Sequence, residues 1–480
     1  MNTKKKKVAK ESQIELVAVD HKPVADLASV TASSQAGPKN IHVHHITRVE
    51  GHGNVVVEID EHGTVSTCRW EISEAPRFFE AMLLGRSHMD VHQIVSRICG
   101  ICSIGHQLSS LQATEGAMEI KVSEQTVRLR KLALHAENMQ SHLLHLGYLV
   151  LPDFLGVPSV LALVNTHPAQ IKNLVSLHRL ANNFSKIICG RTTHPQRLIP
   201  GGMSKLPMAA ELKTLRQSLH DSIPNLTLVS ELFAALKEKL PDFNRKTEYI
   251  ALVSTAEYPF YWGEIGSSMD TRKPTSFYKD MTREYCVSQS TAKWTRNSGE
   301  SFMVGALARF NLNAQWLHHS AQKIAQAVGL QAPCYNPYYN NLAQLVEVFH
   351  SVEDSILLID ILLDCGLKAE PTPYVITQAG KGVGAVEVPR GILYHAYEYD
   401  KNGRIVHADC VIPTNQNHAN IQNDLNALVP LIKDRSEAEI ELITSMLVRA
   451  YDPCISCSTH VIDLTRDTDG NRGVRFVRKG

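Results

Sequence analysis

The sequence lacks several features that would each place it in a specialised class of protein. Its formal net charge is only +1, from 49 basic and 48 acidic residues among 480, so no overall field attracts nucleic acid or an anionic membrane. No apolar run approaches the roughly 20 residues that span a bilayer, and no secretory signal follows the basic start MNTKKKKVAKESQ. These absences exclude nucleic-acid binding and a direct membrane span, and they predict a soluble cytoplasmic protein.

Cysteine is also scarce, which directs attention to the few positions where it clusters. Ten cysteines among 480 residues are too few and too scattered for the disulfide framework of a small secreted protein. Metal binding or catalysis is the better explanation for those that come in groups. Six stand alone, and the other four form two CxxC pairs, Cys99 with Cys102 and Cys454 with Cys457.

The order of patterns along the chain predicts a mainly α-helical domain with small β elements, an α+β fold. Residues 1–40 show no sustained helical or strand period and are expected to form a flexible tail, after which one large domain runs from 41 to 460. Two β-hairpins are predicted, 54–60 with 64–72 and 392–399 with 404–412. Apolar residues at three- and four-residue steps predict helices at about 124–151, 168–189, 208–240, 300–328, 341–364 and 437–450.

The two CxxC pairs resemble one another in their surroundings. They lie in RICGICSIGH at 97–106 and in DPCISCSTH at 452–460, so each pair is followed by a histidine. Chance predicts about 0.2 CxxC pairs in a chain with this many cysteines. Two matching pairs are therefore not accidental, and we expect them to act in the same site. Four thiolates favour a soft or borderline metal.

The separation of the pairs favours a catalytic or redox metal over a structural one. A structural zinc site of four cysteines usually separates its pairs by roughly 15–20 residues, whereas these pairs lie at opposite ends of the domain. Such a site needs the whole domain as its scaffold, which fits a catalytic centre better. The alternative to a catalytic protein is an assembly scaffold without catalytic activity, in which the four cysteines bind a structural zinc ion.

Through the two cysteine pairs and three further sequence motifs, the chain resembles the large subunits of nickel–iron hydrogenases of the cytoplasmic multi-subunit type. The two pairs match that family's two cysteine signatures. Three further parts of the chain agree with the family in order and approximate spacing: ITRVEGHG at 46–53, GRTTHP at 190–195 with PGG at 200–202, and EVPRG at 387–391 with VIPT at 411–414. The resemblance covers about residues 41–460. It implies a large single-domain fold with the active site buried between the two CxxC motifs, and it implies reversible heterolytic cleavage of H₂.

The resemblance also implies how the four cysteines are used. Cys99 and Cys454 would bind nickel terminally, while Cys102 and Cys457 would bridge nickel and iron. Carbonyl and cyanide ligands would complete the iron. Heterolytic cleavage needs a Lewis-acidic metal and a nearby base, and the base is either Cys454 or Arg390.

Five residues near the motifs are expected to surround the centre. By resemblance, Arg390 would stand beside the metals, and Asp452 would help to hold it. Pro389 and Thr414 would surround the diatomic ligands of the iron. His106 would orient a thiolate.

Further residues are assigned to protons and to a second metal. By resemblance, Glu50 is the proton gate, a carboxylate that can relay a proton in both directions if burial raises its pKa. Glu80, His460 and the backbone carbonyl of Cys410 match a site for Mg²⁺ or another divalent ion, for which oxygen ligands are expected. Ser141 stands where respiratory relatives carry an aspartate, which makes a canopy role for an acidic side chain doubtful.

The electrons need a route that this chain does not supply. Apart from the two pairs no cysteine cluster remains for an iron–sulfur cluster, so an iron–sulfur small subunit is implied. Further electron-carrier subunits of the flavin, NAD(P) or ferredoxin type are expected. The nearest alternative, a quinone-reactive complex I-type subunit, shares the fold but characteristically lacks the full cysteine set. Residues 380–384, GKGVG, lack nucleotide-binding spacing and are expected to let the backbone approach the buried site.

The end of the chain is expected to be removed during maturation. Residues 461–480, VIDLTRDTDGNRGVRFVRKG, are polar and arginine-rich in their second half, a composition that packs poorly into a core. The resemblance implies such a removal, because many members of the family are made with a short C-terminal extension that a dedicated protease cuts off immediately after the histidine of the second motif, once nickel has been inserted. Nickel-insertion proteins and a maturation protease are therefore expected partners.

Overall fold

The computed structural model describes residues 38–43, 46–371 and 375–459 of the chain. The expected N-terminal tail up to residue 37, the predicted metal ligand His460 and the expected extension at 461–480 lie outside the described residues. The described part is mainly α-helical with small β-sheets, which confirms the predicted fold class.

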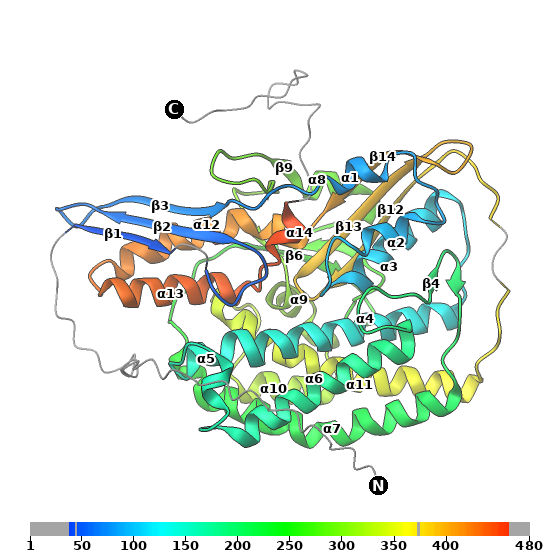
Figure 1. Cartoon of the computed structure of the whole chain (residues 1–480), viewed down its shortest axis with the longest axis horizontal. Helices are drawn as coiled ribbons and strands as arrows, with labels where there is room; N and C mark the ends of the chain where they lie inside the picture. The colour runs from blue at the N-terminus through cyan, green and yellow to red at the C-terminus, as the bar shows by residue number, and fades with distance from the viewer. Residues whose placement is uncertain (1–37, 44–45, 372–374, 460–480) are drawn as a thin grey trace, which may run out of the picture.

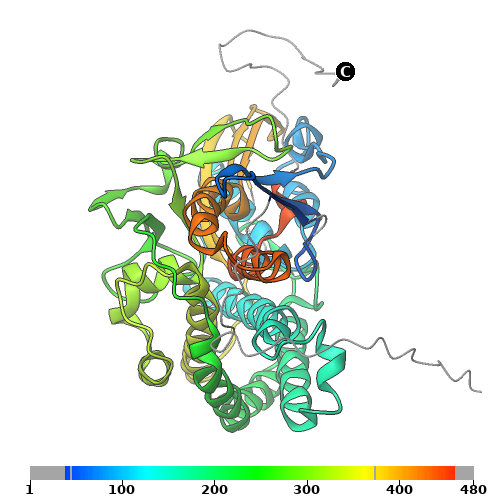
Figure 2. The same ribbon diagram turned by 90° about the vertical axis from the view of Figure 1, so that its left-hand side faces the viewer.

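Four long helices form one layer of the molecule (Figures 1 and 2). α4 packs against α6 and α11, and α7 contacts α6 and α11. Side chains at three- and four-residue spacing face the interior, so that Leu129, Leu132 and Met139 of α4 are fully buried. The bounds agree closely with the predicted helices for α6 (Pro168–Cys189), α7 (Ala209–Leu236) and α11 (Asn340–Cys365). The helix predicted over 124–151 is α4 (Glu124–Leu144), which ends earlier and continues as a π-helix over His145–Val150.

The three largest sheets lie in the other layer, together with α3 (Ser103–Ala117), α12 (Pro413–Ile432) and α13 (Glu437–Ala450). The strand orders are β1-β2-β3, β11-β6-β7-β8 and β12-β13-β14, and every neighbouring pair is antiparallel except β11 with β6. The strands are β1 (Lys39–Val43), β2 (Gly53–Ile59), β3 (Val65–Ile72), β6 (Glu248–Val253), β7 (Glu264–Ser267), β8 (Thr271–Lys273), β11 (Phe302–Met303), β12 (Gly380–Val388), β13 (Gly391–Tyr399) and β14 (Ile405–Val411). Both predicted hairpins are confirmed, as β2 with β3 and β13 with β14.

The glycine-rich strand β12 lies directly against helix α3 (Ser103–Ala117). A Cβ atom added at Gly382 would lie 1.9 Å from the carbonyl oxygen of Ala113, and one at Gly384 would lie 1.9 Å from that of Ser109. Only glycine permits such an approach. The glycines therefore bring the strand to the helix that begins next to Cys102.

The prediction of one helix over 300–328 is wrong. The segment forms the short strand β11, then α9 (Ala306–Asn313) and α10 (His319–Ala327). Gly305 has φ 120°, and Leu317 has an extended backbone, so the helical conformation is interrupted on both sides of α9. Phe302 and Met303 instead pair with β6.

The C-terminal helices carry the chain back to the N-terminal sheet. α12 (Pro413–Ile432) packs against β3, and α13 (Glu437–Ala450) contacts α12 and β1. A capping box begins α13, since Ser436 and Glu439 exchange side-chain and backbone hydrogen bonds. The short elements are α1 (Phe79–Leu83), α2 (Val91–Val95), α5 (Leu151–Phe154), α8 (Tyr278–Met281), α14 (Ile455–Ser458), β4 (Leu198–Ile199), β5 (Gly202–Met203), β9 (Arg283–Tyr285) and β10 (Trp294–Arg296).

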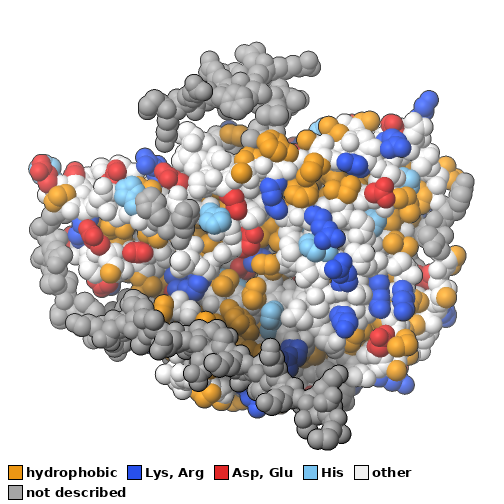
Figure 3. Space-filling model, in the orientation of Figure 1, with side chains coloured by type: hydrophobic (Ala, Val, Ile, Leu, Met, Phe, Trp, Pro, Cys, Tyr) orange, Lys and Arg blue, Asp and Glu red, His pale blue; other side chains and the backbone are white. Residues whose placement is uncertain are grey.

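The surface is chemically mixed. On the face shown in Figure 3, charged side chains of both signs are interspersed with apolar ones, in keeping with the near-zero net charge. Over the described residues, no helix combines the length and apolar character required to cross a membrane.

Candidate metal centre

The four cysteines of the two pairs converge on one buried point. Their sulfur atoms all lie within 4.8 Å of one another, with 3.5 Å between Cys99 and Cys454 and 4.0 Å between Cys102 and Cys457. Each cysteine is at most 5% exposed, and none of the four forms a disulfide. Four soft donors at this spacing, shielded from solvent, fit a centre of nickel and iron, which thiolates bind well.

The backbone brings the second pair to the first. Cys454 forms a parallel bridge with Glu50, in which the amide of Ile455 donates to the Glu50 carbonyl at 2.9 Å. The guanidinium of Arg77 donates to the carbonyl of Ile98 and, at 2.6 Å, to that of Ser456. Arg77 thus joins the loops that carry the two pairs, a role that no local pattern in the sequence signals.

The first pair is held in place by a buried carboxyl group. Glu137 of α4 accepts hydrogen bonds from the amides of Ile104 and Gly105, at 2.7 and 3.1 Å, in the first turn of α3. Burial raises the pKa of Glu137 to about 8. The carboxyl satisfies amides that a helix leaves unpaired at its start, and it thereby fixes Cys102, which precedes that turn.

The thiols perturb each other's acidity. Hydrogen bonds from the other three thiols lower the pKa of Cys99 well below its ordinary value, and the Arg390 guanidinium acts in the same direction. Burial raises the pKa of Cys457. The amides of Ile101 and Cys102 also donate to the Cys99 sulfur, at 3.3 and 3.2 Å. The cluster thus favours a thiolate at Cys99, the form that binds metals.

Arg390 projects from the turn between β12 and β13 toward the segment that leads into the second pair. Its Nε donates to the Asp452 carbonyl at 2.6 Å, Nη2 donates to the Asp452 carboxylate at 2.8 Å, and Nη1 donates to the Ser141 hydroxyl at 3.2 Å. Burial alone would lower the pKa of Arg390, but Asp452 and the cysteines raise it above its ordinary value. The side chain is therefore a fixed, buried cation.

Three other predicted residues, Thr414, Pro389 and His106, are buried. The Thr414 hydroxyl accepts from the Cys454 amide at 3.0 Å, and the Pro389 carbonyl accepts from Arg309 at 3.1 Å. His106 pairs through Nδ1 with His395 at 3.0 Å, and its buried Nε2 has no hydrogen-bond partner in the part of the chain that the structure describes. Burial lowers the pKa of His106 to about 4, so its imidazole is neutral at neutral pH.

Glu50 lies beside the second pair. Its carboxylate accepts from the Ser456 amide at 3.0 Å, and the residue is half-buried. The carboxyl therefore contacts the backbone between Cys454 and Cys457.

Two of the residues predicted for the second metal, Glu80 and Cys410, are in contact with one another. The Cys410 amide donates to Glu80 at 2.9 Å. Burial raises the pKa of Glu80 to about 8, and it raises that of nearby Glu284 to about 7 although Lys293 lies 3.0 Å from Glu284. Buried carboxyls that resist ionisation fit a hard divalent cation, whose charge would favour the ionised form.

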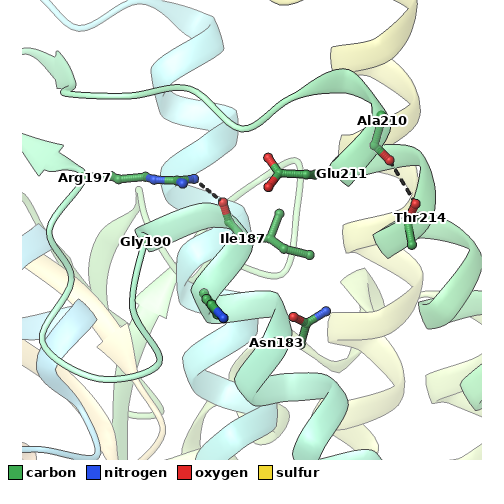
Figure 4. Close-up of a pocket in the computed structure, with 8 residues that line it drawn as sticks. Asn183, Ile187, Gly190, Arg197, Ala210, Glu211 and Thr214 are labelled. Atoms are coloured by element: carbon green, nitrogen blue, oxygen red, sulfur yellow. Dashed lines mark hydrogen bonds between the residues drawn. The ribbon is translucent and has the colours of Figure 1, made fainter.

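A surface hollow lies away from these residues. It has a volume of about 470 Å³ between the end of α6 and the start of α7 (Figure 4). None of the predicted site residues lines it; the lining residues are Asn183, Lys186, Ile187, Gly190, Arg197, Ala210, Glu211 and Thr214.

The fold and the four buried thiols define a metalloenzyme whose centre needs soft donors from both ends of its domain. A family model described as nickel-dependent hydrogenase matches residues 77–180 and 298–460, and one described as HoxL-like matches residues 40–75. The chain belongs to the nickel-dependent hydrogenase family, as the motifs predicted. It is an oxidoreductase that acts on hydrogen. The family match also supports a nickel–iron centre in this chain.

Individual relatives agree with the family match. The chain is 34% identical to sulfhydrogenase 1 subunit alpha of Pyrococcus furiosus, over 88% of this chain and 98% of that protein. It is 26% identical to the NAD-reducing hydrogenase HoxS subunit beta of Cupriavidus necator, over 87% and 94%. A crystal structure of an NAD⁺-reducing nickel–iron hydrogenase in the H₂-reduced state superposes with a TM-score of 0.79 at 23% identity, covering 90% of this chain and 100% of that one. This last likeness shows the shared fold.

Proposed function

We propose that the chain is the catalytic large subunit that cleaves and forms H₂ at a nickel–iron centre held by Cys99, Cys102, Cys454 and Cys457. The observation that carries the proposal is the convergence of these four sulfur atoms within 4.8 Å, although 355 positions separate Cys99 from Cys454. A local zinc module does not need such a scaffold.

The residues around the cysteines suit the separate parts of this centre. Cys99 and Cys454 would hold nickel terminally, and Cys102 and Cys457 would bridge to iron, whose carbonyl and cyanide ligands Pro389 and Thr414 would surround. When bound, the centre supplies a Lewis acid that polarises the H–H bond and accepts its electrons. Four sulfur ligands that are almost fully buried exclude water from that step.

The chain's own residues supply the proton steps. Of the two candidate bases, Cys454 takes the proton, because Arg390 is held as a cation and its guanidinium has no acceptor for one. The two bonds from Arg390 to Asp452 keep that positive charge fixed without motion of the side chain. Glu50 then relays the proton outward, and the Ser456 amide holds its carboxylate beside the second pair. His106, neutral and buried, would orient one of the thiolates.

A second metal would support the C-terminal end of the described chain. Glu80 and the Cys410 carbonyl, with His460, would bind Mg²⁺ or another divalent ion. The hydrogen bond between Glu80 and the Cys410 amide supports the pairing of these two segments.

The electrons require a partner. Among the described residues, the four pair cysteines form the one cysteine cluster suited to a metal, and no second cysteine cluster is present to hold an iron–sulfur cluster. We therefore include an iron–sulfur small subunit, and further flavin, NAD(P) or ferredoxin-type subunits that pass electrons to a soluble carrier in the cytoplasm. One relative is named as NAD-reducing, which favours a carrier of that kind.

Metal analysis combined with an activity assay tests the proposal. The natively matured complex should contain nickel and iron, and it should reduce an artificial dye with H₂ as the electron donor. Zinc without nickel would instead support an assembly scaffold. Quinone-dependent activity without nickel would support a complex I-type subunit.

A further inference from the structure

Arg309 of α9 contacts the turn from which Arg390 projects. Its guanidinium is fully buried, and Nη1 donates to the Val388 carbonyl at 2.9 Å while Nη2 donates to the Pro389 carbonyl at 3.1 Å. The other donors bind carboxylates: Nε and Nη2 to Glu347, both at 2.6 Å, and Nη1 to Glu387 at 2.8 Å. These five bonds use all five N–H groups of a guanidinium.

The turn that Arg309 holds has little freedom of its own. β12 ends at Val388 and β13 begins at Gly391, so Pro389 and Arg390 alone connect the strands. Gly391 has φ 133°, and a Cβ added there would lie 2.5 Å from a methyl group of Val304. Because each peptide is planar, holding the carbonyls of Val388 and Pro389 fixes the two peptides before Arg390.

The carboxylates around Arg309 are themselves held in place. Glu347 of α11 also accepts from His142 at 2.8 Å and from the Tyr258 hydroxyl at 2.7 Å, and Glu387 accepts from the Leu252 amide at 2.7 Å. A buried ion cluster of this kind adds little net stability over apolar side chains of the same size. What it offers is a defined position for the guanidinium.

We propose that Arg309 is a positioning residue for H₂ turnover: it fixes the backbone root of Arg390, while Asp452 fixes the tip of the side chain. The inference rests on the proposed function, in which Arg390 acts beside the metals. Because Asp452 fixes the tip of the Arg390 side chain, that side chain cannot move to make up for a displacement of its backbone. A displacement of about 1 Å at a reacting group can lower turnover by roughly 100-fold.

The decisive variant is Arg309→Lys. Lysine keeps the charge, but its single ammonium cannot reach both carbonyls and both carboxylates. The turnover number of the nickel-loaded enzyme should fall roughly 10- to 100-fold, with unchanged nickel content and KM for H₂. The backbone amides of Arg390 and Gly391 should exchange faster with solvent, a readout that does not depend on activity.

A double-mutant comparison shows whether Arg309 acts through Arg390. Once Arg390→Lys has removed the Arg390 guanidinium, adding Arg309→Lys should cause no further loss of turnover. Arg130→Lys is the matched control. Arg130 is also fully buried and paired with a carboxylate, Glu115, at 2.6 Å, but it does not bind the turn. It should leave exchange at Arg390 unchanged, and any loss it causes should multiply with that of Arg390→Lys.

The outcomes separate this inference from the proposed function. Wild-type turnover and amide exchange in Arg309→Lys, or a loss that multiplies with that of Arg390→Lys, would overturn the inference alone. Wild-type turnover in Arg390→Lys would overturn the role of Arg390 and the inference with it. If Arg309→Lys does not fold, Glu387→Gln weakens the cluster with Arg309 in place, and the same comparisons apply.

Discussion

Replacing Gly384 by alanine should displace the helix that begins beside Cys102. The added Cβ would lie 1.9 Å from the Ser109 carbonyl oxygen and 2.9 Å from the Cβ of Gln112. Carbon–oxygen contacts in proteins lie at about 3.3–3.6 Å, so β12 and α3 would have to separate by about 1.4 Å. The nearest atom belongs to the helix backbone, which cannot rotate away as a side chain can.

The size of the effect follows from that displacement. Overpacking of this kind costs about 1–3 kcal/mol. The unfolding entropy of a chain of this length is about 1 kcal/mol per kelvin, so Tm should fall by only about 1–3 °C. Turnover is the more sensitive quantity, because movement of a metal ligand by about 1 Å can lower it by roughly 10- to 100-fold. The variant should therefore be stable, folded and nearly inactive.

Calorimetry, nickel analysis and H₂-dependent dye reduction measure these quantities on the same preparation. Gly299→Ala is the control, because a Cβ there meets nothing within 4 Å and the backbone conformation is ordinary. It should match the wild type in all three measurements. If Gly384→Ala also matches the wild type, the close approach of β12 to α3 does not position the cysteine, and the reasoning fails.

Four further predictions concern the centre and its surroundings. Cys102→Ser should abolish nickel binding and H₂ uptake, because a hydroxyl is a poor ligand for soft metals; normal nickel content would argue against a four-cysteine centre. Glu50→Gln should lower exchange between H₂ and D₂O by roughly 100-fold or more with metal content unchanged, and wild-type exchange would remove Glu50 from the proton route. Because the pKa of Glu80 is raised to about 8 from 4.5, the folded metal-free protein keeps a proton that the unfolded chain releases, so its stability should fall as pH rises from 4.5 through 8. Glu80→Gln should flatten that decline in denaturant titrations, and an equal decline in both proteins would exclude Glu80 as its source. Mass spectrometry of the active enzyme should find a chain that ends at His460, whereas an active, nickel-loaded chain ending at Gly480 would show that no cleavage is needed.

The sequence predicted the elements whose patterns are long and regular. α6 and α11 begin and end within one residue of the predicted bounds, because each carries an uninterrupted apolar stripe. β6 was not predicted, since the short buried run EYIALV has no alternation that would distinguish a strand from a helix. The error over 300–328 has the same origin, since the apolar residues of α9 and α10 keep a helical period across the breaks near Gly305 and Leu317.

The candidate site was predicted where its residues stand in motifs. The cysteine pairs, Arg390 and Glu50 belong to short segments with recognisable chemistry, so the sequence alone identifies them. Glu137, Arg77 and Arg309 could not be identified in this way, because each is a single charged residue far along the chain from the backbone group that it binds. Their roles arise only when tertiary packing brings them to those groups.

The distance between the two cysteine pairs has a consequence for how the protein is made. Cys454 follows Cys99 by 355 positions, which at a synthesis rate of about 5–20 residues per second is a delay of about 20–70 s. For that interval the first pair exists as half a site, with two thiols that have no partners to complete a metal centre. The second pair reaches it only after both layers of the fold have been synthesised. A chain whose synthesis stops before Cys454 therefore lacks half of the cysteine ligands. The complete metal centre can bind only after synthesis and folding have reached α14, the C-terminal helix of the described residues.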